Sequence, residues 1–202
     1  MLTPTCPWPA RPRGVPVDMT TTLVLGNASS GSTAHAESLL RHHERVTCLT
    51  TAQRPSTTQT AEARARLGRS AAPRPAAWTT LPTTSLSMAL LAARHAVLVA
   101  SVPDWVWSVV DAEQAWDDPR RAADLLRAAL DEAAVALRAL PQDVVLVSEE
   151  PPCHLPGASE DLLLAELLTV ANQRLAAACT HVHVVLAGRV LDLSSAPTVT
   201  TR

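Results

Sequence analysis

Short apolar runs alternate along the chain with longer stretches in which apolar residues recur at helical spacing. Four runs are strand candidates, at 22–25, 46–50, 96–101 and 144–148, and the continuous apolar character of 96–101 indicates burial on both faces. The longer stretches predict helices at 33–42, 61–67, 85–94, 118–139 and 159–179. Two further runs, 181–186 and 189–193, flank Ala187-Gly188 and predict an antiparallel hairpin.

The helix at 118–139 carries the clearest boundary signals. Asp118 is suited to the N-cap, Pro119 to the first helical position, and Pro141 to a stop. In the same way Ser159 is expected to cap the helix at 159–179.

Strands that alternate with helices of ten or more residues predict an α/β fold. We expect a three-layer, mainly parallel, doubly wound sheet, with the hairpin at its C-terminal end. Such sheets bind ligands at the carboxyl ends of their strands. The proline-rich segment 1–18 is expected to be a disordered leader, 19–195 the folded domain, and 196–202 a disordered tail. Met19 is an alternative to Met1 as the initiator.

Composition narrows the possible partners. All 17 basic positions hold Arg, because the chain has no Lys, and the formal net charge is -2. This balance gives no electrostatic footprint for nucleic acid or for an anionic membrane surface. The longest apolar run is far shorter than the ~20 residues that span a bilayer. Four scattered cysteines form no C-x-x-C pair, which favours reduced thiols and a cytoplasmic location.

A phosphate-loop frame lies between the first strand and the first helix. The sequence fits G-x-x-x-x-G-x-[ST], the Walker A pattern, in the strand-to-helix context that the pattern requires. The candidate nucleotide-binding residues are Gly26, Asn27, Ala28, Ser29, Ser30, Gly31, Ser32 and Thr33. The Lys expected after the second glycine is replaced by Ser32. A tight strand-to-helix connection without a ligand is the alternative interpretation.

This frame keeps part of its chemistry without the Lys. Backbone N–H groups and the helix N-terminus still favour an anion, and the Thr33 hydroxyl remains available to Mg²⁺. Glu150 is a further candidate for Mg²⁺ or a ribose hydroxyl. The cation that stabilises a phosphoryl group in its transition state is lost. We therefore expect GTP or ATP binding with weakened phosphoryl transfer.

Other candidate residues have structural interpretations beside the functional ones. His154 could replace a nucleophile, or be an exposed loop histidine. The tryptophan-rich segment that follows the third strand could be a ligand lid, an oligomer contact or a cap on the core. His181 and His183 share one strand face and could bind metal, although a half-exposed face is favoured. Asn172 is expected to bond to a neighbouring strand, and Glu37 could be a solvent-facing helix residue.

The wider sequence resembles the adenosylcobinamide kinase / adenosylcobinamide-phosphate guanylyltransferase family of cobalamin synthesis over residues 20–193. The resemblance is carried by GNASSGSTAHAE at 26–37, RPAAW at 74–78, VVLVSEE at 144–150 and NQRLAAA at 172–178. It implies that residues 19–195 form a nucleotide-binding domain of the P-loop NTPase type. It also implies a trimer that phosphorylates adenosylcobinamide with a nucleoside triphosphate and then transfers GMP from GTP through a guanylylated histidine.

Several chemical positions of that family are changed in this chain. The P-loop Lys falls on Ser32, the guanylylated His on Arg69, a strand-end acid on Ala100 and a glutamate on Pro82. Retained types are Thr33, Glu37, Trp78, Glu150 and Asn172. The resemblance therefore implies a cobalamin-pathway member with weakened or lost catalysis. The alternatives are a non-catalytic subunit of an intact paralogue, or a site rebuilt with Asp104, Asp111, Glu149 or His154.

Overall fold

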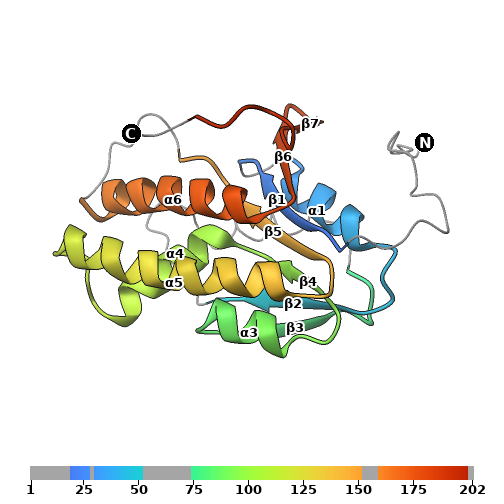
Figure 1. Cartoon of the computed structure of the whole chain (residues 1–202), viewed down its shortest axis with the longest axis horizontal. Coiled ribbons are helices and arrows are strands. Elements are labelled where there is room, and N and C mark those ends of the chain that lie inside the picture. Colours follow the sequence, from blue (N-terminus) through green and yellow to red (C-terminus); the bar gives the residue numbers. More distant parts are fainter. Residues whose placement is uncertain (1–18, 28–29, 52–73, 152–158, 200–202) are drawn as a thin grey trace, which may run out of the picture.

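The computed structural model describes residues 19–27, 30–51, 74–151 and 159–199, and its centre is a seven-stranded sheet with helices on both faces (Figure 1). The strands are β1 (Thr21–Leu25), β2 (Val46–Thr50), β3 (Thr79–Pro82), β4 (Ala96–Val99), β5 (Val144–Ser148), β6 (His181–Leu186) and β7 (Arg189–Asp192). The helices are α1 (Ser32–Leu40), α3 (Leu86–Ala92), α4 (Val102–Ala112), α5 (Pro119–Ala139) and α6 (Ser159–Ala178). The strand order is β3-β2-β4-β5-β1-β6-β7.

All neighbouring strands pair in parallel except β6 and β7, which are antiparallel. The predicted mainly parallel sheet and the C-terminal hairpin are therefore confirmed. At the hairpin turn, Ala187 and Gly188 both have positive φ, of 50° and 69°. Glycine adopts such φ values without the steric cost that a Cβ brings.

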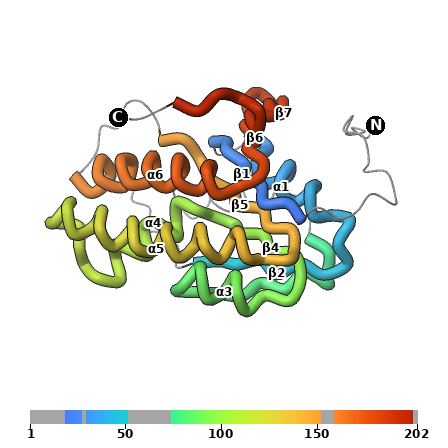
Figure 2. Tube along the Cα trace, viewed as in Figure 1, coloured from blue at the N-terminus to red at the C-terminus, as the bar shows by residue number. Residues whose placement is uncertain are grey.

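Alternate side chains of β1 pack into the two layers that cover the sheet. Leu23 belongs to the larger apolar core, together with residues from α3, α4, α5 and α6. Val24, its neighbour, belongs to the smaller core, which includes Leu40 of α1 and Trp78. This alternation follows from the period of two in a strand, and it confirms the three-layer arrangement. Helices α5 and α6 run side by side over the larger core (Figure 2).

Helix α5 forms where the sequence predicts it. The Asp118 side chain accepts a hydrogen bond from the Arg121 N–H at 3.0 Å, as an N-cap does. The helix ends at Ala139, two residues before Pro141. Leu126, Leu130 and other apolar residues of one face are buried against the sheet.

Most of the tryptophan-rich segment is helical. Residues Val102–Ala112 form α4, whose Ser101 hydroxyl accepts from the Asp104 N–H at 3.2 Å. Trp105 is 1% exposed and lies in the larger core. The expectation of a lid or an oligomer contact is wrong for this residue, because its indole fills the space between the sheet and the helices. β3 is a second element that the apolar pattern does not predict.

Some expectations concern residues that the structure does not describe. The leader 1–18, the helix at 61–67 and residues 200–202 of the tail lie outside the described residues. The described residues 193–199 form no helix or strand. None of the described helices combines the length and the apolar character that crossing a bilayer requires.

Candidate functional site

The loop between β1 and α1 lies at the carboxyl ends of the central strands. The Gly26 N–H donates to the Ser148 carbonyl at 3.0 Å, so the start of the loop is joined to the end of β5. α1 begins at Ser32, one residue earlier than predicted. Ala28 and Ser29 lie outside the described residues. The described part of the Walker A frame thus occupies the edge at which doubly wound sheets bind ligands.

The loop makes hydrogen bonds with its own side chains. The Ser32 hydroxyl donates to the Gly26 carbonyl at 3.2 Å, and the Ser32 N–H donates to the Ser30 hydroxyl at 3.2 Å. The Ser30 N–H donates to the Asn27 carbonyl at 2.9 Å. Ser32 itself is 6% exposed. The side chain at the Lys position therefore braces the loop, and two of the loop's N–H groups, those of Ser30 and Ser32, are already bonded within it.

Both glycines of the frame meet a steric requirement. A Cβ at Gly26 would lie 2.5 Å from the Ser30 hydroxyl and 2.8 Å from Ser32 Cβ. Gly31 is the N-cap residue of α1 and has a φ of 95°, in the left-handed region. Any L side chain at either position would strain the loop.

Three predicted site residues lie at the same edge of the sheet. Thr33 is partly exposed in the first turn of α1, where backbone N–H groups have no partner within the helix. Glu150 is exposed two residues after β5. Asp104 stands in the first turn of α4, which follows β4. Among the described residues, no hydrogen bond or ion pair joins Glu150 to the loop.

Asn172 of α6 holds the end of β5 through two hydrogen bonds. Its Oδ1 accepts from the Ser148 hydroxyl at 2.6 Å, and its Nδ2 donates to the Glu149 carbonyl at 2.9 Å. Asn172 is 4% exposed. The predicted bond between this mid-helix residue and a neighbouring strand is confirmed, and it fixes the backbone from which Glu149 and Glu150 extend.

Glu37 of α1 and Arg74, which precedes β3, form an ion pair. Arg74 Nε donates to Glu37 Oε1 at 2.7 Å, and the Glu37 side chain is 5% exposed. Glu37 is therefore not a solvent-facing helix residue, and that alternative is wrong. Burial raises the pKa of the nearby Cys48 thiol. Trp78, from the same segment as Arg74, is buried in the smaller core. The RPAAW segment is thus joined to α1 through the Glu37–Arg74 pair and to the smaller core through Trp78.

The sequence pattern does not predict the pair that His35 forms with His183. His35 Nε2 lies 3.0 Å from His183 Nδ1, and His183 is 5% exposed. The expectation of a half-exposed strand face is wrong for His183. Burial, reinforced by the neighbouring His183, lowers the pKa of His35 to about 4. Burial also lowers the pKa of His183. Both imidazoles are consequently neutral near pH 7.

The remaining candidates divide between structural roles and undescribed positions. Asp111 accepts a hydrogen bond from the Trp116 Nε1–H at 3.2 Å, a contact that fixes the turn after α4. His154 and Arg69 lie outside the described residues. Cys48 and Cys179 are free thiols.

Comparison with known families accounts for this arrangement. The model of the family described as cobinamide kinase / cobinamide phosphate guanyltransferase matches residues 22–193. No curated protein matches the chain. The match spans every described strand and helix except the first residue of β1, and it includes both the loop after β1 and the Asn172 support. The chain belongs to the cobinamide kinase / cobinamide phosphate guanyltransferase family.

Proposed function

We propose that the chain binds a purine nucleoside triphosphate, GTP or ATP, at the loop of residues 26–33, and that its phosphoryl and nucleotidyl transfer are weakened or lost. Membership of the family places the chain in the nucleotide-loop assembly of cobalamin biosynthesis. The observation that carries the proposal is the position of the Ser32 side chain. This short side chain is buried and its hydroxyl donates to the Gly26 carbonyl, at the position where this loop type has the mobile cation of a Lys.

Binding and catalysis depend on different parts of such a loop. Ground-state binding uses backbone N–H groups and the positive end of a helix, and α1 still supplies both. Phosphoryl transfer additionally needs a positively charged group beside the negatively charged phosphoryl group in the transition state, and loss of a single such stabilising group costs about 10²-fold or more in rate. Because the chain has no Lys, no other lysine ammonium group can replace the missing one.

A divalent cation fits the residue types at this edge. The Thr33 side chain is partly exposed in the first turn of α1, and Glu150 is exposed at the end of the adjacent β5. Bound Mg²⁺ would neutralise phosphate charge. In this chain Thr33 would orient the cation through its hydroxyl, while the Ser30 hydroxyl competes with phosphate for the Ser32 N–H.

Two measurements on the purified full chain test the proposal. The first is equilibrium binding of a non-hydrolysable GTP analogue, with and without Mg²⁺. The second is incubation with GTP labelled at the α or γ phosphate, in the presence of adenosylcobinamide, followed by analysis of protein and corrinoid. We expect saturable nucleotide binding with no covalent label and little or no labelled corrinoid. Absence of nucleotide binding would overturn the proposal, and rapid labelling would show an active enzyme with a rebuilt site.

Variants distinguish the loss of catalytic groups from the loss of the binding framework. Thr33→Ala should weaken the Mg²⁺-dependent part of binding, whereas Thr169→Ala, an exposed change on α6, should leave it unchanged. Combining Ser32→Lys with Arg69→His should restore some transfer activity if the framework still accepts both substrates. Continued inactivity with intact nucleotide binding would indicate that corrinoid binding is lost, and would favour the role of a non-catalytic subunit.

Assembly is a separate proposal. The trimer that the family resemblance implies stays a prediction, and sedimentation of the purified chain, with and without nucleotide, tests it.

A further inference from the structure

Three potential metal ligands meet at the edge of the sheet opposite the loop of residues 26–33. His42 and His43 lie in the turn that joins the end of α1 to the start of β2. Asp143 immediately precedes β5. The register of β2, β4 and β5 brings their amino ends together, because Val46 pairs with Ala96 and Val97 with Val144. The cluster is therefore remote in the fold from the proposed nucleotide site.

The donor atoms of this cluster converge on one carboxylate oxygen. His43 Nε2 lies 2.9 Å from Asp143 Oδ2, and His42 Nε2 lies 3.5 Å from the same oxygen. The three ligand atoms all lie within 4.8 Å of one another. In a tetrahedral zinc site with bonds near 2.0–2.1 Å, ligand atoms are about 3.3 Å apart. The cluster thus needs only small side-chain rotations to hold an ion.

We propose that His42, His43 and Asp143 form a binding site for a divalent transition metal, best matched by Zn²⁺, with a water or anion at the fourth position. Two imidazoles and one carboxylate are a donor set that zinc accepts. Three protein ligands with one position left open is the arrangement of zinc sites that bind an exchangeable fourth ligand.

The carboxylate is already fixed in place for this role. Asp143 is 4% exposed, and its Oδ1 accepts from the Thr20 N–H at 2.7 Å and from the Thr20 hydroxyl at 3.0 Å. These bonds leave Oδ2 directed toward the two imidazoles. Hydrogen bonds that orient a ligating carboxylate are a regular feature of metal sites.

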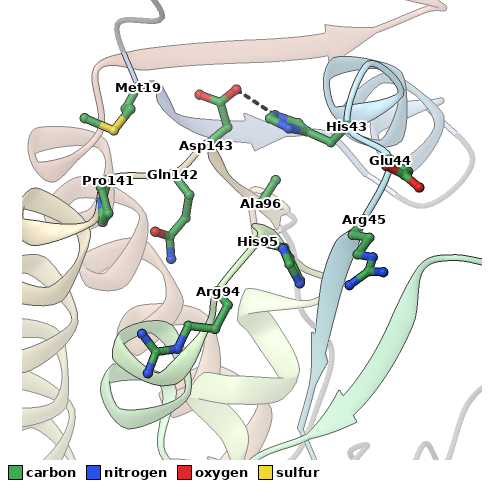
Figure 3. Close-up of a pocket in the computed structure, with 10 residues that line it drawn as sticks. All are labelled: Met19, His43, Glu44, Arg45, Arg94, His95, Ala96, Pro141, Gln142 and Asp143. Atoms are coloured by element: carbon green, nitrogen blue, oxygen red, sulfur yellow. Dashed lines mark hydrogen bonds and ion pairs between the residues drawn. The ribbon is translucent and has the colours of Figure 1, made fainter.

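The surroundings leave room for the fourth ligand. Asp143 and His43 line an open pocket of about 490 Å³, seen in Figure 3 with the Asp143–His43 interaction dashed. Arg45, Arg94 and Glu44 line the same pocket, so a ligand that entered it would meet charged groups of both signs. Water or a small anion can therefore reach the metal from this side.

A hydrogen bond between His43 and Asp143 alone would explain only part of the geometry. Such a bond would anchor the turn after α1, and it requires nothing of His42. Yet the His42 ring packs 4.0 Å from the His43 ring, between centroids, and also directs Nε2 at Asp143 Oδ2. The two imidazole nitrogens and the carboxylate oxygen together form a set of potential metal ligands. One bound cation would interact favourably with all three.

The test uses the full chain, freed of any affinity tag and treated with chelator. Zn²⁺ binding is measured by titration calorimetry, and Co²⁺ binding by the visible absorption that tetrahedral coordination gives. We expect saturable binding of Zn²⁺, a tetrahedral Co²⁺ spectrum and a rise in thermal midpoint with Zn²⁺. His43→Asn should remove the Co²⁺ spectrum and weaken binding at this site by more than about 10-fold, a loss typical even of residues that only support ligands.

Two more variants make the outcome specific. His95→Asn changes an exposed histidine of the same pocket outside the cluster, and it should bind Zn²⁺ as the wild type does. Asp143→Asn keeps the size of the side chain and an acceptor for Thr20, so it tests the ligand charge with little change of shape. The proposal is overturned if the wild type binds no Zn²⁺, or if His43→Asn and Asp143→Asn, folded by circular dichroism, bind as tightly as His95→Asn.

Discussion

Arg74 Nε donates a hydrogen bond of 2.7 Å to Glu37 Oε1, although the two residues are 37 positions apart in the sequence. The carboxylate is almost fully buried, while the Arg74 side chain is 34% exposed. Because of this difference in burial, loss of Arg74 should destabilise the fold more than loss of the Glu37 charge. A buried carboxylate without its cation pays a desolvation cost, whereas a half-exposed guanidinium can turn to water.

We therefore expect Arg74→Ala to destabilise the fold by about 2–3 kcal/mol, and Glu37→Gln by less, because the amide carries no charge to desolvate. Urea unfolding of both variants measures the difference. Arg127→Ala, which breaks an exposed pair with Asp124 on α5, is the matched control and should cost little. Equal losses in Arg74→Ala and Arg127→Ala would show that the Glu37 pair is no more important than a surface pair.

Asn172 provides a second test, on the support of β5. Asn172→Ala removes its two bonds, to the Ser148 hydroxyl and the Glu149 carbonyl, and leaves a buried carbonyl without that donor. We expect a loss of about 2–3 kcal/mol. Ser148→Ala removes only the first bond and should cost less. Denaturant unfolding measures both, and a larger cost for Ser148→Ala would contradict the role assigned to Asn172.

Trp105 tests the correction made to the tryptophan-rich segment. Its side chain is 1% exposed in the larger core, so Trp105→Ala should destabilise the fold by about 3–5 kcal/mol. Trp107, on the same helix, is only partly buried, and Trp107→Ala should cost clearly less. If Trp105 were part of a mobile lid, its removal would alter ligand binding and leave thermal stability nearly unchanged.

The overall fold could be predicted from sequence because its main elements carry local signals. β4 and most of β5 are continuous apolar runs, β1 and β2 carry shorter ones, and α5 has a cap, an N-terminal proline and a regular apolar face. α4 was missed because valines and tryptophans with low helix propensity dominate it. Its Ser101 cap and the following Pro103 were the signals available. β3 has four exposed residues, so no alternation marks it.

The candidate site was predictable only where the chemistry is local. The residues of the Walker A frame are consecutive, and their strand-to-helix context is visible in the sequence. The contact of His35 with His183 joins residues 148 apart, and that of His43 with Asp143 joins residues 100 apart. Neither pair shares a motif, because the strand order and the packing of α1 and its following turn against the sheet bring the partners together. The His42-His43 doublet was visible, but nothing local indicated a carboxylate partner.

Acid should weaken the fold through His35. Burial and the adjacent His183 lower the pKa of His35 from 6.5 to about 4. Between these values the unfolded chain binds a proton that the folded chain excludes, so stability is full above pH 6.5 and falls as the pH approaches 4. Urea midpoints at pH 7 and pH 5 measure this slope. His35→Asn should flatten it relative to His95→Asn, and an unchanged slope would show that His35 does not carry the effect.

Alanine substitutions at Gly26 and Gly188 distinguish the cost of steric crowding from the cost of backbone strain. A Cβ at Gly26 would collide with Ser30 and Ser32, whereas one at Gly188 meets nothing within 4 Å. Gly188→Ala should cost only the strain of its φ of +69°, about 1–2 kcal/mol. Gly26→Ala should cost more and also abolish nucleotide binding, because Ser30 and Ser32 must move and the loop loses its bonded shape. Thermal unfolding and nucleotide titration of both variants check this, and retention of binding by Gly26→Ala would show that the described loop is not the nucleotide site.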